Sequence, residues 1–92
     1  MILSFLDPDV AAVFSGARVR RFANILAVAQ RKLQNLDSAV TLDALRAPPG
    51  NRLEALKGDR KGQYSIRIND HWRVCFVWHD GGAEQVEIVD YH

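Results

Sequence analysis

The sequence predicts an α+β domain in which helices cover one face of a mostly antiparallel β-sheet. Two patterns and their order along the chain predict this class. Apolar residues recur with helical spacing in the N-terminal half, whereas residues 63–90 alternate between apolar and polar side chains as strands do. The 92 residues are 48% apolar and 25% charged, which is typical of globular proteins, and we expect a single domain over residues 1–92.

A short strand and a short helix are predicted first. Ile2 to Phe5 is an apolar run that suits a strand. The pair Asp7-Pro8 is a helix-start signal, because Asp caps free backbone N–H groups and Pro fits the first helical position. Gly16 then marks the end of this helix.

A longer helix is predicted over residues 17–36. Its apolar face is formed by Phe22, Ile25, Leu26, Ala29, Leu33 and Leu36. The first turn would hold Arg18, Arg20 and Arg21, and positive charge is unfavourable at the positive end of the helix dipole. Either an anionic partner offsets that cost or these arginines are solvated at a frayed end.

Strands follow a turn-rich connector at residues 41–50. We expect three to four further strands, the clearest of them at 63–68, 72–78 and 84–90. Opposite residues must share a face, so a three-residue turn at 69–71 is needed to keep arginine out of the core. A five-residue turn at 79–83 is expected next and pairs Trp78 with Glu84, Phe76 with Val86 and Val74 with Ile88.

This pairing predicts which side chains gather on the face of the sheet away from the helices. They are Gln63, Ser65, Arg67, Arg73, Glu87 and Tyr91. Arg67 lies opposite Arg73, and like charges in that position repel. One interpretation is a surface ion pair between Arg73 and Glu87, with Arg67 in solvent. The other is a face that binds an anion.

The net charge of +1 conceals an ordered distribution. Residues 18–32 carry five bases and no acid, residues 46–73 carry seven bases and three acids, and residues 74–92 carry four acids and no Lys or Arg. Two basic blocks therefore alternate with acidic ones.

The composition excludes several classes of protein. A single cysteine, Cys75, and three widely spaced histidines provide no metal-ligand motif, so we expect no metal and no cofactor. We expect no membrane association, because no apolar stretch approaches the length of a membrane span. The acidic residues Asp7 and Asp9 argue against a signal peptide, and the expected location is cytoplasmic.

The remaining polar residues suit metal-free RNA cleavage. Anion binding is available from Lys57, Arg60, Lys61, Arg67 and Arg73. Tyr91 offers a stacking surface, and proton transfer is available from Glu54, Asp90 and His92. In this reaction a base activates a ribose 2′-OH, which attacks the adjacent phosphorus, while an acid protonates the departing 5′ oxygen and cations stabilise the developing charge.

A distinctive combination of residues comprises residues 56–60, Gly62, residues 64–66 and 72–74, and the final Asp90-Tyr91-His92. In this combination the chain resembles the HigB toxins of the RelE/ParE superfamily of type II toxin–antitoxin systems. The resemblance implies a RelE-like fold and a ribosome-dependent mRNA endoribonuclease that cuts mRNA in the ribosomal A site. It also implies neutralisation by a HigA-type helix-turn-helix antitoxin, with operator DNA contacted only through that antitoxin.

The resemblance also implies roles for individual residues. Lys57 and Arg73 match the basic phosphate-binding positions of the family, and Asp90, Tyr91 and His92 match its catalytic group, whereas Arg60, Lys61 and Arg67 are expected to bind RNA. Some members carry a histidine near the position that Glu54 occupies here, so we expect either Glu54 or Asp90 to be the general base, with His92 as acid or as proton shuttle. The alternative function is a non-catalytic binder on the same fold: a relative of gyrase poisons, or a degenerate toxin that serves as antitoxin partner and co-repressor.

Overall fold

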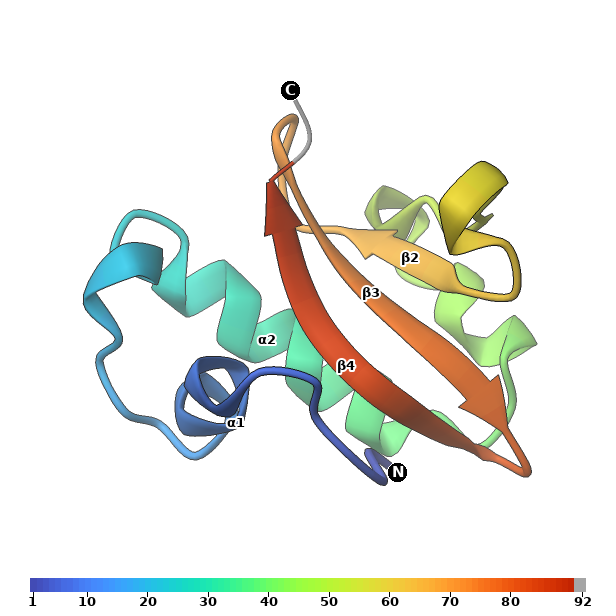
Figure 1. Ribbon diagram of the computed structural model, residues 1–92, viewed down its shortest axis with the longest axis horizontal. Helices are drawn as coiled ribbons and strands as arrows, with labels where there is room; N and C mark the ends of the chain where they lie inside the picture. Colours follow the sequence, from blue (N-terminus) through green and yellow to red (C-terminus); the bar gives the residue numbers. More distant parts are fainter. Residues whose placement is uncertain (91–92) are drawn as a thin grey trace.

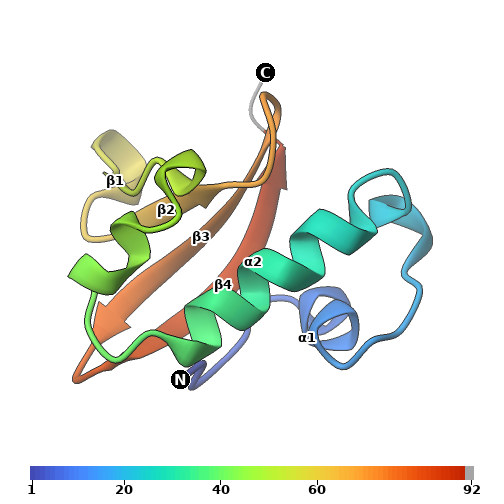
Figure 2. The same ribbon diagram turned by 180° about the vertical axis from the view of Figure 1, so that it is seen from behind.

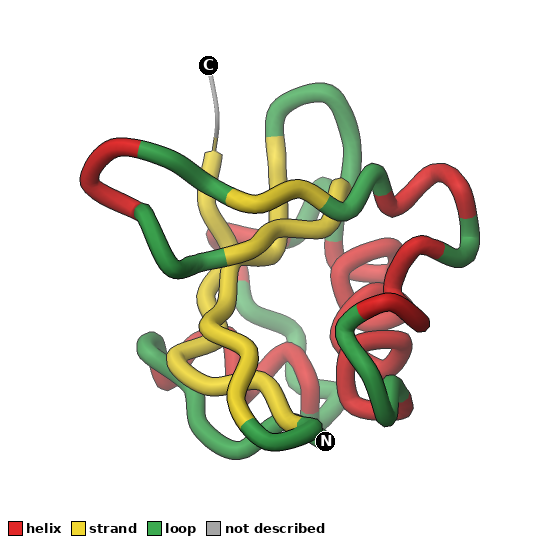
Figure 3. The backbone as a smooth tube through the Cα atoms, turned by 90° about the vertical axis from the view of Figure 1, so that its right-hand side faces the viewer, coloured by secondary structure: helices red, strands yellow, loops and turns green. Residues whose placement is uncertain are grey.

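A computed structural model describes residues 1–90 as an α+β fold, as predicted. Its elements are α1 (Pro8–Phe14), η1 (Arg20–Phe22), α2 (Leu26–Ser38), η2 (Asp43–Arg46), η3 (Pro49–Asn51), β1 (Glu54–Ala55), η4 (Gly58–Arg60), β2 (Tyr64–Arg67), β3 (Trp72–His79) and β4 (Gly82–Asp90). The strands form one antiparallel sheet in the order β1-β2-β3-β4. Both α-helices lie on the same face of this sheet (Figures 1 and 2). Figure 3 shows the loop that carries η4 at the upper left, with strands between this loop and α2.

Helix α1 begins and ends where the sequence predicts. The Asp7 carboxylate accepts a hydrogen bond of 2.8 Å from the backbone N–H of Asp9, and Pro8 occupies the first helical position. Gly16 follows the helix with φ of +95°, a conformation that glycine adopts without strain. Val10 and Val13 are buried against the core.

Helix α2 begins nine residues later than predicted, at Leu26. The side chain of Arg21 is paired with both Asp7 and Asp9, and Phe22 packs edge-on against Trp72 with ring centroids 5.8 Å apart. These contacts hold the segment before Leu26 in the short η1 turn. The arginines of this segment are therefore not in the first turn of α2, and the expected conflict with the helix dipole does not arise.

The β2–β3 hairpin has the predicted register. Ile66 pairs with Val74 and Arg67 with Arg73, as the three-residue turn requires. The Asn69 side chain closes the turn, because its Oδ1 accepts hydrogen bonds from the backbone N–H groups of residues 71 and 72 at 2.8 and 2.9 Å.

The β3–β4 hairpin differs from the prediction at its turn. Asp80-Gly81 forms a two-residue turn with φ of +48° and +79°, and Trp78 pairs with Ala83 instead of Glu84. Asp-Gly is a strong signal for such a turn, because both of its central residues need positive φ. A β-bulge that includes Gln85, at φ of +53°, then adds one residue to β4, so Val74 pairs with Ile88 as predicted.

The predicted N-terminal strand is present only as a segment bridged to β4. Ile2 and Phe5 form isolated parallel bridges with Ala83 and Val86. The segment also supports the bulge, because the Ser4 hydroxyl accepts a hydrogen bond from the Gln85 N–H at 2.9 Å. Along residues 1–6 the chain thus runs beside the first half of β4 (Figure 1).

The hydrophobic core lies between the sheet and the helices. The sheet contributes Ile66, Ile68, Val74, Phe76, Ala83, Val86 and Ile88, and α2 contributes Ala29, Leu33 and Leu36. Trp72 and Trp78 pack half-buried against this core, and Cys75 is buried. Within residues 1–90, no helix is long and apolar enough to cross a membrane.

Candidate active site

Strand register brings the predicted polar residues together on the helix-free face. Glu54, Ser65, Cys75 and Glu87 are consecutive partners across the four strands. Because directly opposite residues share a face, these four side chains form one row. Arg67 and Arg73 are paired in a parallel row on the same face. The predicted gathering of Ser65, Arg67, Arg73 and Glu87 is therefore confirmed.

The Arg73 guanidinium is held by two neutral acceptors. Its Nε donates a hydrogen bond to the Ser65 hydroxyl at 2.6 Å, and its Nη2 donates to the backbone carbonyl of Arg52 at 2.8 Å. Ser65 is fully buried, so this acceptor is in a fixed position. Within residues 1–90, no carboxylate forms an ion pair with Arg73. Among the described residues the group is thus oriented without a carboxylate to compensate its positive charge.

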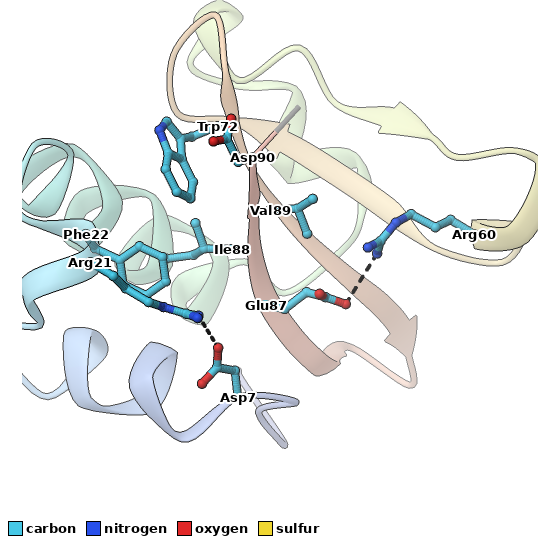
Figure 4. Close-up of a pocket in the computed structure, with 9 residues that line it drawn as sticks. All are labelled: Asp7, Arg21, Phe22, Arg60, Trp72, Glu87, Ile88, Val89 and Asp90. Carbon is cyan, nitrogen blue, oxygen red and sulfur yellow. Dashed lines mark hydrogen bonds and ion pairs between the residues drawn. The ribbon is translucent and has the colours of Figure 1, made fainter. Parts of the chain in front are cut away.

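Glu87 is paired with Arg60 instead of Arg73. The distance from Arg60 Nη1 to Glu87 Oε2 is 3.3 Å (Figure 4). The same Nη1 donates to Gln63 Oε1 at 3.0 Å. The surface ion pair between Arg73 and Glu87, considered as one interpretation of the sequence, is therefore wrong. Cys75, not Arg73, is the residue opposite Glu87, and the loop at η4 brings Arg60 over the row.

The other predicted cations lie around this face. Arg67 pairs with Asp70 in the adjacent turn. Lys57 is exposed immediately before η4, and Lys61 is exposed immediately after it. A hollow of about 560 Å³ is lined by Glu54, Ala55, Leu56, Lys57 and Arg60. A carboxylate and two cations therefore converge at the β1 side of the face.

Asp90 lies on the other face of the sheet from Arg73. It pairs with Trp72 at the end of β4, and its side chain lies beside Trp72 and away from Glu87 and Val89 (Figure 4). Asp90 and Trp72 both line a second hollow, of about 420 Å³. Its full lining is Asp7, Arg21, Phe22, Arg60, Trp72, Glu87, Ile88, Val89 and Asp90. The two candidate bases, Glu54 and Asp90, are thus on opposite faces. Tyr91 and His92 lie outside the described residues.

Two residues immediately after the connector, which sequence reasoning missed, contribute to the site. Arg52 provides the carbonyl that accepts from Arg73, and Asn51 is a fully buried polar residue immediately before it. Asn51 follows Pro48-Pro49-Gly50, and asparagine is common in turns, so a turn alone accounts for an asparagine at this position. No sequence signal indicated a tertiary contact at either residue.

The cluster of donors needed for a metal site is not found in the described part of the chain. No group of three or more His, Cys, Asp or Glu side chains within residues 1–90 is arranged to hold a metal ion.

Two solved structures share the fold of this chain. The chain superposes on the YoeB–YefM complex from Staphylococcus aureus with a TM-score of 0.61 at 18% identity, covering 100% of this chain and 98% of that one. It superposes on a mutant of YafQ from E. coli with a TM-score of 0.60 at 12% identity, covering 98% and 93% of the two chains. The fold is therefore that of the RelE-like toxins.

Sequence comparison identifies the family. Residues 14–92 match the model of the HigB-like toxins, described as the RelE-like toxin of the type II toxin–antitoxin system HigB, and the chain belongs to this family. It is 53% identical to Toxin HigB-1 of Vibrio cholerae over 53 residues, which are 58% of this chain and 56% of that protein. It is 36% identical to Endoribonuclease HigB of Proteus vulgaris over 61 residues, which are 66% of this chain and 65% of that protein. The matched segments thus span between about half and two thirds of these relatives.

Proposed function

We propose that this protein is an endoribonuclease toxin that cleaves mRNA in the ribosomal A site without a metal ion. The observation that carries the proposal is the Arg73 guanidinium, which two neutral acceptors orient on a face that also bears Glu54, while Lys57 lines the same hollow as Glu54. A preorganised cation of this kind stabilises charge that develops on phosphorus in the transition state. The name of the Proteus vulgaris relative supports the same activity.

Glu54 is our choice for the general base. It is paired with Ser65, whose hydroxyl holds Arg73, so base and phosphate-binding cation are on one face. Glu54 takes the 2′-OH proton, the 2′ oxygen attacks the phosphorus, and Arg73 with Lys57 stabilises the negative charge of the phosphorane. The roles of Tyr91 in stacking the base and of His92 in protonating the 5′ oxygen remain part of the proposal. Asp90, on the other face, is the alternative base.

The proposed partners are a HigA-type antitoxin, the ribosome and mRNA. The antitoxin is supported by family membership and by the YoeB–YefM complex, which has the same toxin fold. Arg60, Lys61 and Arg67 provide further positive charge for the RNA backbone. Operator DNA is contacted only through the antitoxin.

The second candidate function is a non-catalytic binder on the same fold. One observation favours it: two of the predicted RNA-binding cations, Arg60 and Arg67, are already paired with carboxylates. Such a protein would arrest growth by binding a target, or would act only with its antitoxin.

Primer extension on cellular mRNA after induction separates the two functions. We expect new, codon-linked 5′ ends with the wild-type protein, and none with Arg73→Ala. Arg18→Ala is the matched control, because it removes an exposed arginine outside the helix-free face and leaves the pattern of ends unchanged. Growth arrest without new 5′ ends would refute the nuclease and support the binder.

A further inference from the structure

A buried asparagine links the connector to helix α2. The Asn51 side chain is fully buried, and its Nδ2 lies within hydrogen-bond distance of Asn35 Oδ1 at 2.7 Å and of the carbonyls of Leu45 and Ala47 at 3.0 and 3.2 Å. Because an amide nitrogen has only two hydrogens, one of them is shared between acceptors. This single side chain therefore ties η2, η3 and α2 together.

The acceptor side of the same amide is also used. Lys32 Nζ donates to Asn51 Oδ1 at 2.6 Å, so the orientation of the amide is determined from both ends. Burial of Lys32, and then the nearby Arg31 and Arg67, lower its pKa from the usual value of 10.5. Every polar atom of the Asn51 side chain is thus satisfied, which makes this a rigid attachment point.

The next residue has an unfavourable backbone conformation. Arg52 lies in the left-handed region, with φ of 46° and ψ of 55°, which residues with a Cβ atom adopt only when their surroundings impose it. Its N–H donates to the Pro49 carbonyl at 3.3 Å, and the Asn51 N–H donates to the Pro48 carbonyl at 2.9 Å. This conformation directs the Arg52 carbonyl to Arg73 Nη2, 2.8 Å away.

We propose that Asn51 is a positioning residue for Arg73, acting through the left-handed Arg52 and its carbonyl. The side chain of Asn51 fixes the connector on α2, the connector fixes the Arg52 carbonyl, and that carbonyl with the Ser65 hydroxyl fixes the plane of the guanidinium. The catalytic part of this inference rests on the proposed function, but the positioning itself does not.

Nuclear magnetic resonance of the Arg73 side chain tests the positioning without any activity. The guanidinium signal that disappears in the Arg73→Lys variant is assigned to Arg73. In the wild-type protein we expect slow rotation of the guanidinium, because Nε and Nη2 are both bonded. In Asn51→Ala we expect rotation faster by about tenfold, the factor that corresponds to one net hydrogen bond.

Two control variants separate positioning from a general loss of stability. Val13→Ala removes buried side-chain volume from α1, on the other face of the sheet, and is expected to leave the Arg73 signal unchanged. Arg52→Gly keeps the carbonyl and favours positive φ, so the signal should also persist there. If Asn51→Ala does not fold, Asn35→Ala removes one acceptor of the same amide, and we expect a smaller change in the same direction.

Equal Arg73 rotation in the wild-type protein and in folded Asn51→Ala or Asn35→Ala would overturn the inference. In the cleavage assay, Asn51→Ala is expected to lower kcat between about 10- and 100-fold with KM little changed, and to have no further effect in an Arg73→Lys background. If rotation changes but no variant, including the wild type, cleaves RNA, the proposed function fails while the positioning role stands.

Discussion

Removing the Ser65 hydroxyl is the sharpest test of the site. Ser65→Ala deletes the acceptor that Arg73 Nε reaches at 2.6 Å and, within residues 1–90, leaves the Arg52 carbonyl as the remaining hydrogen-bond acceptor of the guanidinium. A hydrogen bond to a charged group contributes about 1.5–3 kcal/mol. Arg73 is half-exposed, so a hydrogen bond to water can replace part of this contribution. We therefore expect the free energy of unfolding to fall by about 1 kcal/mol.

The effect of the same substitution on catalysis is expected to be larger than on folding. A cation with one anchor is oriented less well toward the phosphorane, and we expect the cleavage rate to fall about tenfold or more, equivalent to about 1.4 kcal/mol of transition-state stabilisation. Urea denaturation gives the first quantity, and single-turnover cleavage of ribosome-bound mRNA gives the second.

A serine elsewhere in the chain provides the matched control. Ser15→Ala removes a hydroxyl that is hydrogen-bonded only to the Ala11 carbonyl at the end of α1, at 3.1 Å, and we expect wild-type cleavage. Unchanged cleavage in folded Ser65→Ala would refute the reasoning that the hydroxyl prepares Arg73 for its role.

Three other predictions concern the base, the ion pair and the partly buried Lys32. Glu54→Gln should abolish most cleavage while Asp90→Asn retains it; the reverse result in single-turnover assays would identify Asp90 as the base. A double-mutant cycle on Arg60 and Glu87, measured by urea denaturation, should give a coupling below about 1 kcal/mol, and a much larger value would mean that the pair organises the fold. The pKa of Lys32 is lowered in the folded state, so the unfolded state binds more protons between that pKa and 10.5, and stability should rise with pH through this window. Lys32→Met should lack that rise in urea titrations, and an identical pH dependence in both proteins would contradict the lowered pKa.

Local signals in the sequence were sufficient to predict several elements of the structure. Asp7-Pro8 and Gly16 delimit α1, because caps depend on the residues at the helix ends themselves. The register of β2 and β3 followed from parity alone, since a one-residue slip would have buried an arginine. The predicted gathering of Ser65, Arg67 and Arg73 on the helix-free face depended on that register and was confirmed with it.

Other features depended on contacts between distant segments. The start of α2 is set by the Arg21 pair with Asp7 and by Phe22 on Trp72, neither of which a periodicity search detects. The predicted length of the β3–β4 turn was wrong for a local reason, because the Asp80-Gly81 signal for a two-residue turn was included in a five-residue turn. The bulge that restores the register at Gln85 is coupled to the N-terminal segment.

The sequence by itself determined the class of fold, the family and the residues that gather on the helix-free face, because periodicity, parity and local motifs are properties of neighbouring residues. Only the tertiary structure decided how the charges are used. It paired Glu87 with Arg60, separated Glu54 from Asp90 by the thickness of the sheet, and brought the Arg52 carbonyl to Arg73. The physical reason is that ion pairs and hydrogen bonds between side chains depend on distances of a few ångströms between segments far apart in the chain.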